Sequence, residues 1–332
     1  MGSKVLVTGG AGFIGSHLID DLLELGYNVV CLDDLSGGYR TNVSDQAEFV
    51  QGSVVDSQLV NRLFMEHHFD YVFHLAAYAA EGLSHFIRHF TYSTNLIGSV
   101  NLINASVKNG VKCFVFTSSI GVYGTNQLPM TEDMMPSPED PYGISKLAVE
   151  LDLRAAHRMF GMNYIVFRPH NVYGERQNIA DRYRNVVGIF MNQVLKGEAM
   201  TVFGDGEQTR AFSYVKDVTP VIARALKYPK AYNEVFNIGA DVPYTVNQLA
   251  RQIAEAMGVQ PNIVHLQRRD EVVHAYSSHQ KVWQYLGAEH GVSLTAGLAC
   301  MAKWVRQCGA RGIPTFQNIE ISINLPQVWL ED

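Results

Sequence analysis

Short apolar runs alternate with longer helical patterns through the first half of the chain. The apolar runs predict strands at 3–8, 28–33, 71–75, 112–117 and 163–168. The patterns between them predict helices at 13–25, 56–67, 85–109 and 141–160. Continuous apolar strands separated by helices are typical of a parallel sheet that is covered on both faces. The chain is therefore expected to have an α/β fold with a doubly wound parallel sheet.

The rhythm loosens after residue 169. Helices are predicted at 181–196, 218–227, 245–257 and 294–308, and short strands at 201–203, 212–215, 235–238 and 262–266. The sequence contains no internal repeat and no linker rich in proline and serine. We therefore expect a main domain at 1–170, to which about 210–240 returns. Residues 171–310 mainly form a smaller interwoven C-terminal lobe, and 311–332 form a tail.

Composition excludes several classes of protein. The 332 residues carry a formal net charge of -6, with 47% hydrophobic and 17% charged residues, as in an ordinary globular protein. An acidic balance argues against nucleic-acid binding. The sequence lacks a window of the roughly 18 apolar residues that a membrane span needs. The first predicted strand also starts too near Met1 to leave room for a secretory signal.

The cysteines and histidines indicate neither a disulfide framework nor a metal site. The four cysteines are scattered and form no CxxC pair, and the twelve histidines form no HExxH motif. Reduced thiols and a cytoplasmic protein without a metal are the expectation.

A glycine-rich turn links the first strand to the first helix. Gly9 permits a sharp turn, Gly12 lets the backbone approach a pyrophosphate, and Gly15 lets the helix lie close to the sheet. Phe13 and Ile14 lie between the last two glycines, where the first helix begins. A dinucleotide would place its pyrophosphate on the N–H groups at this helix start. The turn therefore predicts a Rossmann-type dinucleotide site.

Asp33 ends the second predicted strand. An acid at this place can accept hydrogen bonds from the adenosine ribose and repels a 2′-phosphate, which favours NAD over NADP. The alternative is a solvated turn residue beside Asp34.

Tyr142 and Lys146 are four residues apart in a predicted helix, so both lie on one face. An ammonium group nearby favours the phenolate and would lower the pKa of the tyrosine, which could then act as a general base. A surface pair on a helix is the alternative. Ser119 follows the fourth predicted strand, at the sheet edge where ligands bind in doubly wound folds.

Further motifs occur in order along the chain. They are Gly9–Gly15, His74–Ala77, Ser119, Val122–Gly124, Pro141–Tyr142, Lys146 and Arg168–Gly174. Together they resemble the extended short-chain dehydrogenase/reductase family, and most closely its nucleotide-sugar epimerases of the UDP-glucose 4-epimerase type. The resemblance runs from residue 3 to about residue 310.

The resemblance implies a role for each matching residue. Tyr142 would be the catalytic base, Lys146 would hold the nicotinamide ribose, and Ser119 would bond the substrate oxygen and relay its proton. The turn after the third predicted strand would line the NAD cofactor with Ala76, Ala77 and Tyr78. The substrate would be bound mainly by the C-terminal lobe. The substrate-binding residues would be Ser84, Ser119, Asn171, Arg210, Arg269 and Tyr276. For the two arginines, a surface ion pair is the alternative.

Several positions depart from the family pattern. Ile120 and Gly121 stand where sugar 4,6-dehydratases carry Asp-Glu, which favours plain oxidation and return of hydride. Ser53 replaces the usual aspartate near adenine, and Ala211 replaces an aspartate in Arg-Asp-Phe. His170 stands where relatives often have an aromatic residue, so it would contact the nucleotide sugar or simply pack. Three further residues, expected to be polar groups at a helix start, could instead contact an unusual sugar: Glu81, His85 and Arg88.

The implied activity is NAD-dependent epimerisation at C4 of a nucleotide-diphosphate sugar, first of all a UDP-sugar, through a transient 4-keto intermediate. The resemblance also implies a homodimer through the helices at 85–109 and 141–160. Two alternatives stay open: a nucleotide-sugar oxidoreductase with net redox, and a non-catalytic NAD-binding or RNA-associated protein on the same fold.

Overall fold

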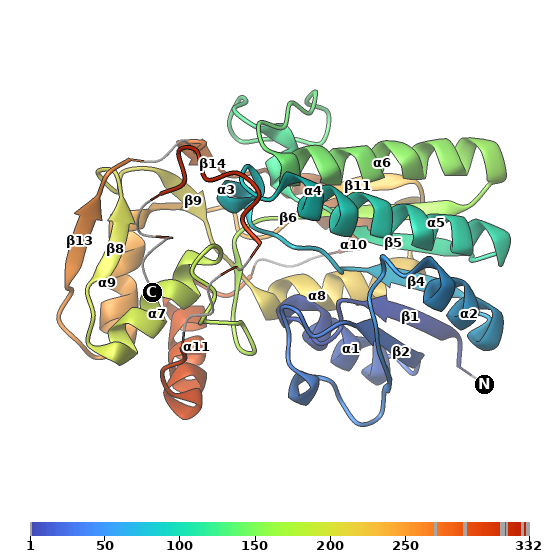
Figure 1. The fold of residues 1–332 in the computed structure, drawn as a ribbon, viewed down its shortest axis with the longest axis horizontal. Coiled ribbons are helices and arrows are strands. Elements are labelled where there is room, and N and C mark those ends of the chain that lie inside the picture. Colours follow the sequence, from blue (N-terminus) through green and yellow to red (C-terminus); the bar gives the residue numbers. More distant parts are fainter. Residues whose placement is uncertain are drawn as a thin grey trace.

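The computed structural model describes residues 2–268, 271–287, 291–312, 316, 318–326 and 329. Within these residues a seven-stranded parallel sheet forms the main body, in the order β11-β6-β5-β4-β1-β2-β3 (Figure 1). Its strands are β1 Lys4–Thr8, β2 Asn28–Asp33, β3 Glu48–Gln51, β4 Tyr71–His74, β5 Cys113–Thr117, β6 Asn163–Pro169 and β11 Glu234–Ile238. The predicted doubly wound α/β fold is confirmed.

Helices cover both faces of this sheet, as Figure 1 shows. On one face lie α1 (Phe13–Glu24) and α8 (Val215–Arg224); on the other lie α2 (Ser57–His67), α5 (Gly98–Lys108) and α6 (Pro141–Phe160). Alternate residues of β1 serve the two cores: Val5 and Val7 join the core of Leu18, whereas Leu6 joins the core of Leu63. Burial on both faces explains why the strands read as continuous apolar runs.

The elements predicted in the first half are present, with two differences. The edge strand β3 was missed, because it is short and only half-buried. The helix predicted at 85–109 begins only at Arg88 and contains a π-helical turn. It consists of α4 (Arg88–Thr91), a π-helical turn at Tyr92–Ile97 and α5, and a separate short helix α3 (Glu81–Ser84) precedes it. Ile87, with φ -137° and ψ 46°, is not helical and separates α3 from α4.

The smaller lobe contains helices packed beside short sheets. Its helices are α7 Val186–Lys196, α9 Val246–Ala256, α10 Gln280–Leu286 and α11 Leu294–Cys308. Its paired strands are β7 Val172–Tyr173 with β10 Ser213–Tyr214, β8 Met200–Phe203 with β13 Ile263–Leu266, and β9 Thr209–Ala211 between β12 Pro243–Thr245 and β14 His274–Ala275.

Two predictions in this lobe were wrong in their bounds. The helix predicted at 181–196 begins only at Val186, because Asn185 takes a left-handed conformation (φ 65°) that a helix cannot continue. The strand predicted at 212–215 is shorter than expected, because β10 covers only Ser213–Tyr214 and Val215 already starts α8. The sequence did not predict helix α10 or strands β7, β9, β12 and β14.

The two parts of the chain are interleaved. Strand β11 pairs with β6 in the main sheet, and α8 packs on α1, although both follow the first strands of the smaller lobe. The C-terminal segment returns to α3 and α4 (Figure 1). There the Glu320 carboxylate accepts hydrogen bonds from the N–H groups of His89 and Phe90 at 2.7 and 2.8 Å. Among the described helices, none combines the length and apolar character needed to cross a membrane.

Candidate active site

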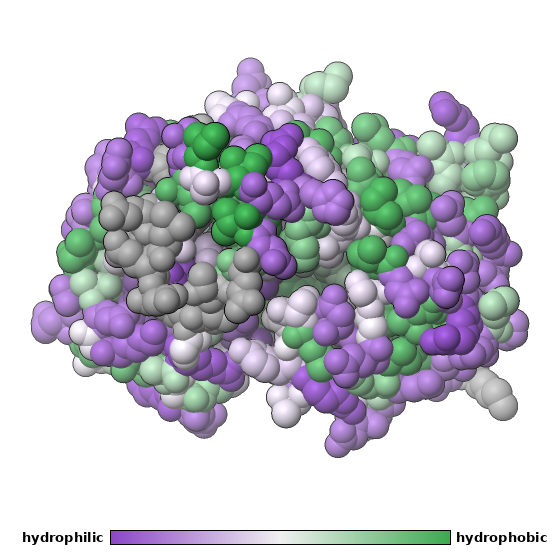
Figure 2. Space-filling model, viewed as in Figure 1, coloured by the Kyte–Doolittle hydropathy of each residue, from purple (hydrophilic) through white to green (hydrophobic). Residues whose placement is uncertain are grey.

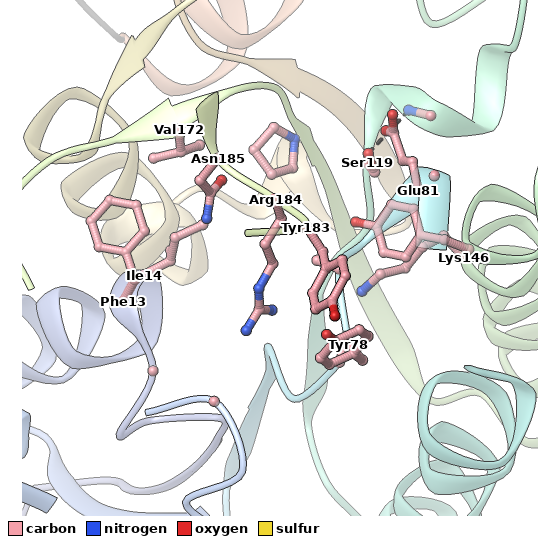
Figure 3. A pocket seen from close by; sticks show the side chains of 18 of the residues that line it. Phe13, Ile14, Tyr78, Glu81, Ser119, Lys146, Val172, Tyr183, Arg184 and Asn185 are labelled. Carbon is pink, nitrogen blue, oxygen red and sulfur yellow. Dashed lines mark hydrogen bonds between the residues drawn. The ribbon is translucent and has the colours of Figure 1, made fainter. Parts of the chain in front are cut away.

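A cleft of about 910 Å³ lies at the carboxyl ends of the main-sheet strands and reaches into the smaller lobe. From β1 the chain builds the sheet outward to β2 and β3, and it then crosses to the other side of β1 to form β4. Ligands of doubly wound sheets bind at this change of side, between β1 and β4. Residues that follow β1, β2, β4, β5 and β6 line it, together with residues from α7, β8 and β9. Figure 3 shows Phe13 and Ile14 on one side of this pocket, with Glu81, Ser119 and Lys146 on the other.

The glycine turn has the geometry that its sequence predicted. Gly9 has a φ of 72°, and a β-carbon there would lie 2.7 Å from the Ala76 nitrogen. A β-carbon on Gly15 would overlap the carbonyl oxygen of Gly9, because α1 starts directly against the turn. The three predicted glycines, with Phe13 and Ile14, line the cleft. Because the three glycines have no side chain, a ligand can approach the backbone of the glycine turn directly.

Asp33 also lines the cleft, at the end of β2. Its carboxylate accepts hydrogen bonds from the N–H groups of Ala11 at 2.9 Å and Leu35 at 2.8 Å. Burial raises its pKa above the ordinary value, and these hydrogen bonds act in the opposite direction. A carboxylate fixed beside the glycine turn is suited to accept hydrogen bonds from a ribose.

Two polar side chains in the same cleft further fit a large polar ligand. Thr117 Oγ1 and both polar atoms of the Gln177 amide are buried without a hydrogen-bond partner among the described residues. Buried polar groups are otherwise nearly always paired. These two side chains, the glycine turn and Asp33 together are suited to bind a dinucleotide.

Tyr142, Lys146 and Ser119 meet in this cleft, although two different elements carry them. Tyr142 and Lys146 lie in the first turns of α6, Ser119 follows β5, and all three are buried. The Ser119 hydroxyl and the Tyr142 phenol are hydrogen-bonded. Lys146 Nζ donates to the Thr117 carbonyl oxygen at 2.8 Å and lies 5.8 Å from the centroid of the Tyr142 ring. The structure thus brings the three predicted catalytic residues together.

The pKa of Tyr142 does not shift as predicted. Burial raises it above its ordinary value, the Glu81 and Asp140 carboxylates raise it further, and the hydrogen bond with Ser119 lowers it. Burial lowers the pKa of Lys146 to about 7, opposed by the charge of Glu150. The net shift of the phenol's pKa is therefore upward, and Lys146 is not among the main causes that act on it. The Lys146 ammonium is directed at a backbone carbonyl, and Glu81 is the first among the charges that act on the phenol.

The turn after β4 is held by a residue that the sequence did not single out. Ala76, Ala77 and Tyr78 line the cleft as expected. Buried Asn95, in the π-helical turn, accepts a hydrogen bond from the Tyr78 N–H at 2.8 Å and donates to the Tyr78 carbonyl at 3.1 Å. Only the fold reveals this clamp, because 17 residues separate its two ends.

Ser84, a predicted substrate contact, does not line the cleft. It is 1% exposed, and its hydroxyl donates to the Glu81 carbonyl at 2.6 Å and accepts from the Tyr142 N–H at 3.3 Å. The position argues for a structural role, since the hydroxyl ties α3 to the start of α6. Glu81 and His85 do line the cleft, whereas Arg88 is not among its described lining residues.

The predicted phosphate-binding residues are only partly brought together. Asn171 and Arg210 line the cleft, and Asn171 donates to the Ala211 carbonyl from a backbone with φ 40°. The Arg210 guanidinium donates to the Thr209 and Val273 carbonyls, both at 2.9 Å. Arg269 lies outside the described residues. Tyr276 is half-buried and is not among the described lining residues, although its carbonyl accepts from the Met130 N–H.

His170 lines the cleft and belongs to a buried polar chain. Its Nε2 lies 3.0 Å from His279 Nε2, and His279 Nδ1 lies 2.6 Å from Asp241 Oδ1. Its Nδ1 faces the Ala211 carbonyl at 3.0 Å. Burial lowers the pKa of His170 to about 3, and the charge of His279 lowers it further. Across the described ranges, no group of three or more His, Cys, Asp or Glu side chains is placed to hold a metal.

Sequence reasoning missed the segment between β7 and α7. Tyr183, Arg184 and Asn185 line the cleft between its two walls (Figure 3). Arg184 pairs with Asp181 at 2.6 Å and lies over the Tyr78 ring at 4.9 Å. The sequence pattern predicts a helix from residue 181, so it gives no signal for this segment.

The fold and the cleft define the class of protein: a Rossmann-type dinucleotide-binding protein with a buried Tyr, Lys and Ser beside the dinucleotide site. Comparisons with known proteins identify the family. The model of the NAD dependent epimerase/dehydratase family matches residues 5–239. The chain belongs to this family, with NAD as its cofactor and nucleotide-sugar epimerase or dehydratase chemistry as its class of activity.

Individual relatives are similar over nearly the whole chain. A putative UDP-glucose 4-epimerase of Methanocaldococcus jannaschii is 34% identical over 91% of this chain and 98% of its own length. A UDP-glucose 4-epimerase of Mycolicibacterium smegmatis is 36% identical over 91% and 98%. The structure of UDP-glucose 4-epimerase from Thermotoga maritima with UDP-glucose has a TM-score of 0.87 and 40% identity, covering 92% of this chain and 99% of that one. The resemblance seen in the sequence is confirmed.

Proposed function

We propose that this protein is an NAD-dependent 4-epimerase of a nucleotide-diphosphate sugar, with a UDP-sugar as the first candidate. The observation that carries the proposal is the meeting of Tyr142, Ser119 and Lys146 in one cleft with the glycine turn and Asp33. Two relatives that are similar over nearly their full length are UDP-glucose 4-epimerases, which supports the same choice of reaction.

In the proposed mechanism, Tyr142 accepts the proton of the sugar O4 hydroxyl. Ser119, hydrogen-bonded to the phenol, orients O4 and relays its proton. When bound there, NAD would supply a positive charge and reversible hydride exchange with C4, and these two residues would hold the sugar for both half-reactions. A positive charge near a phenol lowers its pKa, which would offset the upward shift caused by burial and Glu81. Lys146, near neutral pKa, would hold the nicotinamide ribose.

Several other cleft residues are proposed to bind the two ligands. The glycine turn, Phe13 and Ile14 would hold the cofactor pyrophosphate, Asp33 its ribose, and Ala76, Ala77 and Tyr78 its nicotinamide end. Arg210 and Asn171 would bind the substrate diphosphate with Arg269, because the planar guanidinium pairs with phosphate oxygens. Tyr276 would act through the loop that carries it.

A panel of sugar nucleotides tests the proposal directly. UDP-glucose, UDP-galactose, UDP-glucuronate and dTDP-glucose are incubated with the protein, and the C4 epimers are resolved by chromatography. At least one pair is expected to interconvert without net formation of NADH. Stoichiometric NADH formation would instead identify a nucleotide-sugar oxidoreductase.

The variant Tyr142→Phe tests the role of the phenol. It should lose the base for O4, and the rate should fall by about 100-fold or more. Fold is checked by circular dichroism, because loss of one hydroxyl leaves the packing of α6 intact. Epimerisation at the rate of the unaltered protein would contradict the proposal. Tyr39→Phe, which changes a more exposed tyrosine outside the cleft, is the matched control.

A further inference from the structure

Glu81 adds a carboxylate to the centre formed by Tyr142 and Ser119. Its Oε1 lies 2.9 Å from the position that a β-carbon on Gly121 would take, and Ser119 Oγ lies 3.3 Å from the same position. Glu81 also acts electrostatically on the buried Tyr142 phenol. Figure 3 shows Glu81, Ser119 and Lys146 gathered on one wall of the pocket. Because residue 121 is a glycine, no side chain occupies the space that the Glu81 carboxylate takes.

The backbone that carries Glu81 is tied to the backbone that carries Tyr142. The Ser84 hydroxyl donates to the Glu81 carbonyl and accepts from the Tyr142 N–H. Since Ser84 is buried, this link fixes the start of α3 relative to the start of α6. Side chains held by such supporting contacts keep a defined place in a reaction centre. Glu81 is thus more than a polar residue at a helix start.

The other ionisable groups of this wall have separate tasks. The Asp140 carboxylate caps α6 by accepting from the Gly143 N–H at 2.9 Å. Lys146 donates to the Thr117 carbonyl, and Tyr142 is hydrogen-bonded with Ser119. If Tyr142 and Ser119 bind O4, the Glu81 carboxylate beside Ser119 would lie close to the C4 region of the sugar ring.

We propose that Glu81 is a further catalytic residue, a general base at a carbon next to C4 while C4 is a ketone. The inference rests on the proposed function, because only a 4-keto sugar has acidic C–H bonds beside C4. Removal of a proton α to a carbonyl is a reaction that carboxylate side chains catalyse in enzymes.

In this step a C–H bond at C3 or C5 breaks, and its proton passes to the Glu81 carboxylate. The electron pair of that bond forms a carbon–carbon double bond to C4, and the C4 carbonyl electrons move to O4, which Tyr142 and Ser119 stabilise by hydrogen bonding. The reverse step returns a proton to carbon and restores the ketone, so neither oxidant nor reductant is consumed. Because Glu81 is exposed, its carboxylic acid exchanges its proton with solvent before the return.

Solvent deuterium reveals this step. Epimerisation at C4 alone breaks no C–H bond at C3 or C5 and therefore introduces no solvent hydrogen there. UDP-glucose, UDP-glucuronate and dTDP-glucose are each incubated with the protein and NAD in D2O, and the recovered sugar nucleotides are analysed by proton NMR and mass spectrometry. We expect deuterium at C3 or C5 in both C4 epimers.

The variant Glu81→Gln removes the base and keeps the shape of the side chain. Deuterium per epimerisation event should fall by about 100-fold, in line with the contribution of a general base, while C4 epimers still form. Glu81→Asp, which keeps the charge and withdraws it, should give an intermediate value. Glu139→Gln is the matched control, because Glu139 is another acidic residue of the cleft and should leave deuterium incorporation unchanged.

The outcomes separate the two proposals. Epimers without deuterium at C3 and C5, or deuterium that persists in Glu81→Gln, would overturn the role of Glu81 and leave the 4-epimerase proposal standing. Failure of every sugar nucleotide to form a C4 epimer would contradict the 4-epimerase proposal itself, and the inference that rests on it would fall too.

Discussion

Arg168 and Glu150 form an ion pair behind the residues that follow β5. Arg168 Nη2 lies 2.6 Å from Glu150 Oε2, and the two side chains are 1% and 0% exposed. Glu150 also accepts from the Ser118 hydroxyl, and Arg168 donates to the Tyr123 hydroxyl at 2.7 Å. A buried charge is tolerated only with a partner, so each half of this pair depends on the other.

Replacing Glu150 by Gln should therefore leave the Arg168 charge buried and uncompensated. The free energy of unfolding is expected to fall by about 3 kcal/mol or more, measured by urea denaturation. The control is Lys112→Met, which removes an exposed pair with Asp70 and should cost about 1 kcal/mol or less. Equal losses in the two variants would contradict this assignment.

The buried Lys146 makes stability depend on pH. Its pKa is about 7 in the folded protein, below the ordinary value of 10.5, so between these values the unfolded chain binds more protons. Stability should then rise with pH from about 7 to 10, by up to about 1.4 kcal/mol per pH unit from this group. The difference in unfolding free energy between the unaltered protein and Lys146→Met isolates the effect, and a difference independent of pH would refute it.

At the scale of elements, the turn between β1 and α1 has little room for change. Gly15 lies where any β-carbon would overlap the Gly9 carbonyl oxygen and come within 2.8 Å of the Gly10 α-carbon. These contacts are with backbone atoms, which cannot turn away as the end of a flexible side chain can. The first turn of α1 and the glycine turn are therefore packed directly against each other.

Gly15→Ala should push α1 away from the glycine turn. We expect the affinity for NAD to fall at least about ten-fold, because its pyrophosphate would sit on the N–H groups at the start of this helix. Isothermal titration calorimetry measures the affinity. Gly312→Ala is the control, since a β-carbon there meets open space. Unchanged NAD affinity in Gly15→Ala would contradict this account of the turn.

For the whole molecule, one exposed apolar surface remains to be explained. Ile144 and Leu151 of α6 are 40% and 52% exposed, seven residues apart and so on the same face, and Ile97 beside α5 is 50% exposed. Figure 2 shows hydrophobic side chains on the side of the molecule where α5 and α6 lie. We propose that this surface pairs with its copy in a homodimer.

Leu151→Glu should therefore convert a dimer into a folded monomer, because the interface would bury an unpaired charge at the same position twice. Sedimentation velocity measures the mass in solution. Met65→Glu, which alters an exposed apolar residue on α2, should leave the dimer intact. A monomer in the unaltered protein would refute the proposed pairing.

Local patterns in the sequence were sufficient to predict the main sheet and part of the site. The apolar runs predicted β1, β2, β4, β5 and β6 because a strand buried on both faces must be apolar throughout. The glycine turn and the Tyr142–Lys146 spacing were visible because each lies within one short segment. The lobe after β6 was less predictable, since its short strands take their partners from distant segments, as β8 does from β13.

Only the tertiary structure decided which charges surround the phenol. The sequence could place Lys146 one helical turn from Tyr142, but burial and the nearness of Glu81, 61 residues earlier in the chain, set the direction of the phenol's pKa shift. The same holds for Ser84, which joins two backbones instead of lining the cleft, and for His170, which faces His279. Desolvation and electrostatic interaction depend on distance in space, and a sequence specifies that distance only once the chain has folded.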